Sequence, residues 1–215
     1  MRNQVSTTEQ AGRAFLLCRG IFTAALLLHV AIAVSRSQTP PLAQLSDDES
    51  AVYTALFLDV YQASKSRPIV LSDQTALGVP PGMIANIPVQ GLQTQKFLAP
   101  ISAAAKQDYE DVNHQSKKLP SPCRLAPDCV TADIADLAPQ VKDDRAWRGF
   151  FRKHRNTPGI VVVSRIGFNK QHTEAVVYTG NSCGTLCGQG EFVWLVKRTG
   201  VWAIEDRTTV WISTK

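Results

Sequence analysis

Two cysteines and a cluster of glycines stand together in the segment 180–190, G-N-S-C-G-T-L-C-G-Q-G. Four of the chain's 13 glycines fall within these eleven residues, and Cys183 and Cys187 are four positions apart. Glycine permits positive φ angles and close approach of the backbone to another group, and a short disulfide would hold such a loop rigid. The loop therefore either protects a sheet edge or presents a ring of backbone N–H groups that can bind an anion or a carboxylate. The candidate binding residues of the second interpretation are Asn181, Ser182, Gly184, Gly188 and Gly190.

A second group of candidate binding residues is basic. Between residues 142 and 170 the chain carries eight Lys or Arg residues against two Asp residues. Arg148, Arg152 and Arg155 recur at helical spacing, so they share one face of a helix predicted over 143–154. This face is either a solvated helix surface or a surface that docks on acidic polysaccharide or anionic lipid headgroups.

Candidate catalytic residues are fewer and less specific. Asp73 follows a short apolar run, where an active site could place a carboxylate, although an Asx turn that closes a strand explains this residue more simply. His154 stands near the end of a predicted helix, where a histidine is typically a surface residue. Cys183 with His154 or His172 would form a thiol nucleophile only if Cys183 were outside a disulfide. The sequence contains no G-x-S-x-G, H-E-x-x-H, P-loop or G-x-G-x-x-G motif.

The other cysteines indicate an oxidising compartment. Cys18 lies in the N-terminal segment, which leaves Cys123, Cys129, Cys183 and Cys187 as an even set. An even set in an exported chain predicts two disulfides, and of the three possible connectivities the two local pairings are the simplest. A Cys₄ zinc site is the alternative, but the spacings C-x₅-C and C-x₃-C differ from those of the usual zinc knuckles. We predict no metal site.

The N-terminal segment has the pattern of a secretory signal peptide. Basic residues precede the uncharged run 21–34, within which Ala31-Ile32-Ala33 is the small-x-small pattern that signal peptidase recognises. Fourteen helical residues span roughly 21 Å, which is less than the ~30 Å hydrocarbon core of a bilayer. We therefore predict a signal peptide over 1–33 and a polar linker over 34–45. Anchoring in the inner membrane by residues 21–34 is the alternative.

The rest of the chain predicts the elements that position these residues. Four runs rich in Val, Ile, Trp, Phe and Tyr follow one another toward the C-terminus, separated by turn residues, as is typical of an antiparallel meander. These strands are expected at 160–168, 173–179, 191–198 and from Trp202 onward. Periodicity, caps and prolines predict helices at 46–65, 102–116 and 143–154, a short helix beginning within 131–137, a short strand at 69–71 and a loop over 76–100. We expect a single α+β domain over 46–215, with N-terminal helices packed on a C-terminal antiparallel β-meander of four to five strands.

Several of these motifs occur together in a recognisable order. They are VYTALFLDVY, IVLSDQT, WRGFFRKHRNTPG and SRIGFN…GNSCGTLCGQG followed by the terminal W-I-S, over residues 50–75 and 143–213. In this the chain resembles a family of uncharacterised exported bacterial proteins, which implies a common fold and a shared role for the N-S-C-G-x-x-C-G-x-G segment but brings no known activity. The G-x-W-x-I run at 200–204 is also similar to that of cone-shaped domains of the nuclear-transport-factor-2-like type, a resemblance of fold alone.

Charge and motifs together restrict the class of function. The sequence pI is about 9.0, but residues 34–215 carry 20 basic and 17 acidic residues, a net charge of +3. That balance is ordinary for a soluble protein and argues against a dedicated nucleic-acid binder. We therefore predict an exported protein, periplasmic or secreted, that binds a small ligand or an anionic component of the cell envelope without catalysis and without a cofactor. A hydrolase-like enzyme with a site near Asp73 and the segment 180–190 is the alternative.

Overall fold

The computed structural model of the chain describes residues 44–76 and 100–213. The predicted signal peptide over 1–33, most of the predicted linker and most of the predicted loop over 76–100 lie outside the described residues. All described residues belong to the unit 40–215. Within them, no helix is both long enough and apolar enough to cross a membrane.

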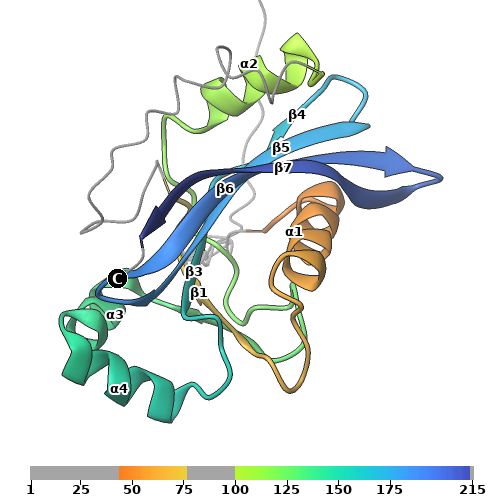
Figure 1. Ribbon diagram of the computed structural model, residues 1–215. Helices are drawn as coiled ribbons and strands as arrows, with labels where there is room; N and C mark the ends of the chain where they lie inside the picture. The colour runs from red at the N-terminus through yellow and green to blue at the C-terminus, as the bar shows by residue number, and fades with distance from the viewer. Residues whose placement is uncertain (1–43, 77–99, 214–215) are drawn as a thin grey trace, which may run out of the picture. The chain divides into compact units, whose positions relative to one another are not determined.

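Seven strands form one mixed sheet, and four helices accompany it (Figure 1). The strands are β1 (Ile69–Ser72), β2 (Cys129–Ala132), β3 (Ile160–Val163), β4 (Gly167–Phe168), β5 (Glu174–Gly184), β6 (Cys187–Arg198) and β7 (Val201–Ser213). The helices are α1 (Asp47–Asp59), α2 (Ala103–Val112), α3 (Ile134–Val141) and α4 (Asp144–Lys153). Strand order is β2-β1-β3-β5-β6-β7, and β4 pairs with β5. The predicted α+β class is therefore confirmed.

The sheet is larger than the predicted four to five strands, and it is not wholly antiparallel. Strand β1 runs parallel to both β2 and β3, whereas β3, β5, β6 and β7 follow one another antiparallel. Strand β2 occupies part of the segment predicted to begin a helix, and α3 starts only after it. Strand β6 lies between β5 and β7, as expected for a run that is apolar on both faces.

The run 160–168 is two strands rather than the predicted single strand. At Ser164 the ladder to β5 changes, because the Ser164 hydroxyl accepts a hydrogen bond from the Tyr178 N–H at 2.8 Å. The next N–H, that of Arg165, donates to Asn113 Oδ1 at 2.9 Å instead of to a strand. Side-chain oxygens that compete for backbone donors in this way interrupt a sheet ladder.

The segment 180–190 is a hairpin, and the prediction of an irregular loop was wrong. Strands β5 and β6 remain paired as far as Gly184 and Cys187, so only Thr185 and Leu186 lie outside the strands. None of the four glycines has a positive φ angle. Their small size matters instead: a Cβ on Gly190 would lie 2.0 Å from the Trp211 indole nitrogen.

Both faces of the central sheet are covered by helices. Strand side chains on one face of the sheet pack against Val52, Leu56 and Phe57 of α1. Those on the opposite face pack against Ala105 and Tyr109 of α2. A third cluster joins α3 and α4 to the start of β1 and β3. Among the described residues, the middle of the sheet is therefore packed with side chains on both faces.

The Asp48 carboxylate attaches helix α1 to strands β6 and β7 near the turn that joins them. The predicted capping box of the helix is present, with Ser46 and Glu49 bonding each other's backbone N–H groups. The Asp48 carboxylate accepts hydrogen bonds from Lys197 Nζ at 2.6 Å and from the Trp202 indole at 3.1 Å. His172 Nδ1 lies 3.1 Å from the same carboxylate. The hydrogen bond from Lys197, helped by those from Trp202 and His172, holds the pKa of Asp48 below its ordinary value despite partial burial.

Gly167→Ala should destabilise the protein by about 1–3 kcal/mol, as overpacking of a core typically does. A Cβ at this position would lie 2.4 Å from the Tyr109 Cα, so the backbone of α2 would have to move. Gly149→Ala is the matched control: its Cβ would meet nothing closer than an Arg152 guanidinium nitrogen at 3.9 Å, and alanine favours the helix by up to about 1 kcal/mol. Urea unfolding of both variants measures the difference. Equal stabilities would contradict this packing.

Asp48→Asn should lower the free energy of unfolding at pH 7 by about 1 kcal/mol, since this carboxylate is partly exposed and its ion pair with Lys197 is lost. A carboxyl whose pKa is lowered by folding stabilises the protein above its unfolded pKa and loses that effect as the pH falls through its folded pKa. The gap between wild type and variant should therefore close below about pH 4. Thermal unfolding followed from pH 7 to pH 2 checks this, and a gap that persists at pH 2 would show that the charge is not responsible.

Candidate functional site

Helix α4 separates aromatic and basic side chains onto different faces. Its N-cap residue, Asp143, accepts a hydrogen bond from the Ala146 N–H at 2.7 Å, which confirms the predicted helix start. Trp147 and Phe150 are buried, and the ring of Phe151 stacks on Trp147 with centroids 5.6 Å apart. The arginines of the helix are exposed. An amphipathic helix of this kind buries its aromatic stripe and leaves its cations in solvent.

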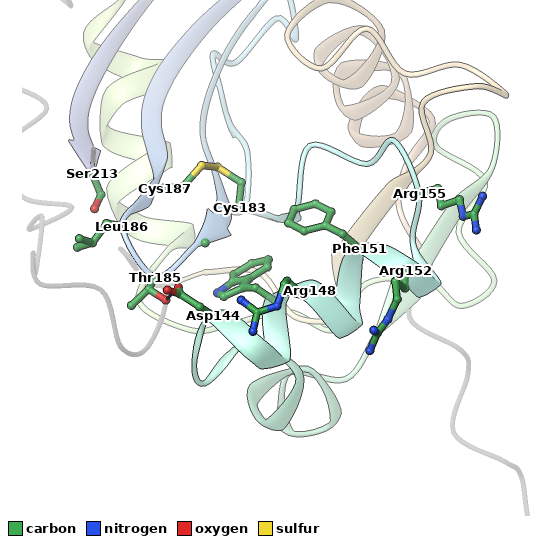
Figure 2. Close-up of a pocket in the computed structure, with 12 residues that line it drawn as sticks. Asp144, Arg148, Phe151, Arg152, Arg155, Cys183, Thr185, Leu186, Cys187 and Ser213 are labelled. Carbon is green, nitrogen blue, oxygen red and sulfur yellow. Dashed lines mark hydrogen bonds between the residues drawn. A yellow bond between two sulfur atoms is a disulfide. The ribbon is translucent and has the colours of Figure 1, made fainter. Parts of the chain in front are cut away.

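The structure brings the predicted binding residues Arg148, Arg152 and Gly184 together in one groove. The other predicted residues do not line it: Asn181, Ser182, Gly188 and Gly190. An open groove of about 1000 Å³ lies between α4 and the end of the β5–β6 hairpin (Figure 2). We call it the α4–hairpin groove. It is lined by Asp144, Trp147, Arg148, Phe151, Arg152, Arg155, the hairpin residues 183–187 and Ser213. Arginines and the glycine–cysteine segment, more than twenty residues apart in the sequence, therefore face a common space.

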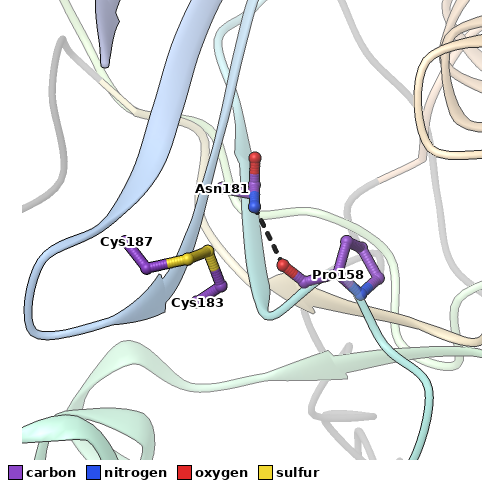
Figure 3. The surroundings of a disulfide bond; sticks show 4 residues. All are labelled: Pro158, Asn181, Cys183 and Cys187. Carbon is purple, nitrogen blue, oxygen red and sulfur yellow. Dashed lines mark hydrogen bonds between the residues drawn. A yellow bond between two sulfur atoms is a disulfide. The ribbon is translucent and has the colours of Figure 1, made fainter. Parts of the chain in front are cut away.

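Helix α4 is attached to the hairpin near both of its ends. At the N-terminal end, the Thr185 hydroxyl donates a hydrogen bond to Asp144 Oδ1 at 2.6 Å. Beyond the C-terminal end, Asn181 Nδ2 donates to the Pro158 carbonyl at 2.8 Å (Figure 3). Gly159 follows with a φ of 105° and approaches Ser182 so closely that a Cβ would lie 1.9 Å from the Ser182 carbonyl oxygen. These contacts hold the two walls of the groove in place.

The disulfides have the simple local connectivity. Cys183 is bonded to Cys187 across the end of the hairpin (Figures 2 and 3). Cys123 is bonded to Cys129. All four thiols are therefore used, which leaves neither a Cys₄ zinc site nor a Cys183 nucleophile. Within the described ranges there is no group of three or more His, Cys, Asp or Glu side chains that could hold a metal ion.

The electrostatics of the groove favour an anion. None of the ion pairs in the described part of the chain involves Arg148, Arg152 or Arg155. The two acidic residues nearest in sequence are already engaged, Asp143 as the helix cap and Asp144 with Thr185. Guanidinium groups without an acidic partner can offer paired N–H donors to a carboxylate or phosphate.

The predicted catalytic residues do not converge on this groove. Strand pairing places Val70 beside Ile160, which pairs with Ser182, so Asp73 lies about 10 Å further along the sheet, in the direction away from the hairpin tip. The buried Asp73 carboxylate lies 3.6 Å from Lys118 Nζ, and its Oδ1 has no hydrogen-bond partner among the described residues.

His154 is part of the aromatic packing of α4. Its ring lies against Phe150 with centroids 4.8 Å apart, and its backbone N–H closes the helix on the Phe150 carbonyl. Burial, together with the neighbouring Lys153 ammonium, lowers the pKa of His154 below its ordinary value. The same surroundings therefore favour the neutral form of this imidazole. The described contacts do not join Asp73, His154 and the hairpin into a hydrolase-like site.

Sequence reasoning identified the arginines and the hairpin but missed several groove residues. Asp144 reads in sequence as a first-turn helix acid, and its bond to Thr185 spans 41 positions, so no local pattern reveals it. Leu186 lies in the two-residue turn and remains 48% exposed. The available signal was the C-x₃-C spacing, because the hairpin reversal must lie among the three residues between Cys183 and Cys187, of which Leu186 is the last.

Replacing each disulfide by two serines should separate two structural roles. Both bridges close short loops, for which the loss of chain entropy predicts a cost of about 2 kcal/mol. Cys123 and Cys129 also pack against the main core, so their loss should cost more than the loss of Cys183 and Cys187, which lie at the hairpin end. Chemical unfolding of the two double variants compares them. If the two variants lose equal stability, or if the 183–187 variant loses more, the Cys183–Cys187 bridge stabilises other parts of the fold besides the hairpin.

The chain was also compared with known proteins. No protein-family model, no curated protein and no solved structure matches it.

Proposed function

We propose that this protein is an exported, non-catalytic binding protein of the cell envelope, and that its α4–hairpin groove holds an anionic group. The observation that carries the proposal is the placement of Arg148, Arg152 and Arg155, without acidic partners, along the groove that the disulfide-closed hairpin completes. The oxidised cysteines support export, because disulfides persist in the periplasm and outside the cell.

The groove is suited to binding rather than to covalent chemistry. The side chains that line it include no free thiol and no histidine, and its one carboxylate, that of Asp144, is bonded to Thr185. Phe151 adds apolar surface beside the arginines. Mostly apolar walls with a few charged groups are typical of sites that orient an anion by its charge and retain it by contact.

The two resemblances enter the proposal as relationships of fold. Shared ancestry with the uncharacterised exported bacterial proteins would give them the same groove, since their common motifs supply both α4 and the hairpin. A cone-shaped domain of the nuclear-transport-factor-2-like type is the finer description of fold that we propose. It is supported by the antiparallel order β3-β5-β6-β7 and by the G-x-W-x-I run at 200–204, which begins β7.

The proposal predicts that polyanion binding depends on the arginines of the groove. On a heparin column, wild-type protein should elute at higher salt than the triple variant Arg148→Gln/Arg152→Gln/Arg155→Gln, because screening by salt competes with these contacts. A matched control removes three positive charges elsewhere: Lys65→Gln, Arg124→Gln and Lys170→Gln, all exposed and outside any ion pair within the described ranges.

The control triple variant should elute close to wild type, because its charges lie outside the groove. If the groove variant elutes with wild type, or if the two triple variants lose retention equally, the proposed anion site is wrong. Circular dichroism confirms that each variant is folded before the comparison.

A further inference from the structure

The tip of the β5–β6 hairpin presents an apolar side chain to solvent. Leu186 is 48% exposed and belongs to none of the hydrophobic clusters among the described residues. Its neighbour Thr185 is held by Asp144, and the Cys183–Cys187 disulfide closes the hairpin directly behind the turn. The leucine is thus exposed on a support that is held by a disulfide and a hydrogen bond. Figure 2 shows Leu186 at the hairpin end with the Cys183–Cys187 disulfide. A rigid support lowers the entropy cost of docking.

Positive charge lies on the adjacent helix α4 and next to its two ends. Residues 142–155 contain six exposed basic side chains: Lys142, Arg145, Arg148, Arg152, Lys153 and Arg155. None of them takes part in an ion pair within the part of the chain that the structure describes. The two acidic residues of the segment are bonded to the helix N-terminus and to Thr185. The hairpin end of the molecule therefore combines an exposed apolar side chain with basic side chains on the neighbouring helix.

We propose that this end of the protein docks on a bilayer that contains anionic phospholipid. Leu186 enters the interfacial region, and the arginines of the α4–hairpin groove contact lipid phosphates. The inference rests on the proposed function, whose anionic group it assigns to a phospholipid headgroup.

A bilayer explains the tip better than an acidic polysaccharide does. A polysaccharide chain offers anions to the arginines but no apolar phase in which Leu186 could be buried. A bilayer offers both, and partly buried apolar groups with nearby cations are the usual means by which a protein lies on an anionic membrane surface. The exposed Leu186 therefore favours an anionic bilayer over an acidic polysaccharide as the binding partner.

Co-sedimentation of the full chain with phosphatidylglycerol vesicles and with phosphatidylcholine vesicles tests the proposal. Wild type should bind the anionic vesicles and bind phosphatidylcholine at least tenfold more weakly. Leu186→Ser should weaken binding to anionic vesicles roughly fivefold, the value expected for a half-buried leucine. Leu58→Ser is the matched control, because Leu58 is also 48% exposed but lies on α1. It should bind like wild type.

Heparin retention of the same variants separates the two proposals. Leu186→Ser should keep wild-type retention, whereas the triple arginine variant should lose both retention and, by roughly 100-fold, vesicle binding. If Leu186→Ser and Leu58→Ser bind vesicles alike while the arginine variant loses heparin retention, membrane docking is wrong and the anion groove stands. If the arginine variant loses neither, both proposals are wrong. Equal binding to the two kinds of vesicle also overturns membrane docking.

Discussion

The attachment of α4 to the β5–β6 hairpin is the constraint on which the functional end of the molecule depends. Thr185 holds the start of the helix through Asp144, and Asn181 holds the chain just beyond its end through the Pro158 carbonyl. A helix fixed near both ends against a hairpin cannot rotate its side chains away from it. The helix therefore presents Arg148 and Arg152 to the groove, although neither has an ion-pair partner among the described residues.

A chain of modest net charge nevertheless contains a strongly positive segment. Residues 34–215 have a net charge of only +3. Residues 142–155 carry six exposed basic side chains against two acidic ones, Asp143 and Asp144, which gives this segment a net charge of +4. The local field, rather than the overall balance, is what an approaching ligand meets.

The sequence best predicted those features that depend on residues close to one another in the chain. The helix over 143–154, the capping box at Ser46 and the pairing of cysteines four and six positions apart are all local, and all are found. Strand β2 was missed because four residues carry no periodic signal, and its partner β1 lies sixty positions away. The parallel half of the sheet depends entirely on such distant pairing.

The hairpin was mispredicted for a different reason. Glycine serves two purposes that look identical in sequence, freedom of φ and absence of a side chain. At Gly190 the second purpose applies, since the space that a Cβ would fill holds the Trp211 indole, hydrogen-bonded at 2.8 Å to the Tyr178 hydroxyl. The groove could not be predicted from the sequence either, because the contact between Asp144 and Thr185 joins residues 41 positions apart.

The strand order also governs the course of folding. Strands β5, β6 and β7 are joined by two short turns, so their pairing closes small loops and can occur early. Strand β1 has only partners that lie far downstream, since Val70 pairs with Ile160 and Val130. A chain that emerges with its N-terminus first must therefore hold β1 unpaired until most of its length has appeared. The short separations within β5–β7 and the long ones to β1 therefore favour a sheet that assembles from its C-terminal hairpins toward its N-terminal strand, against the direction of synthesis.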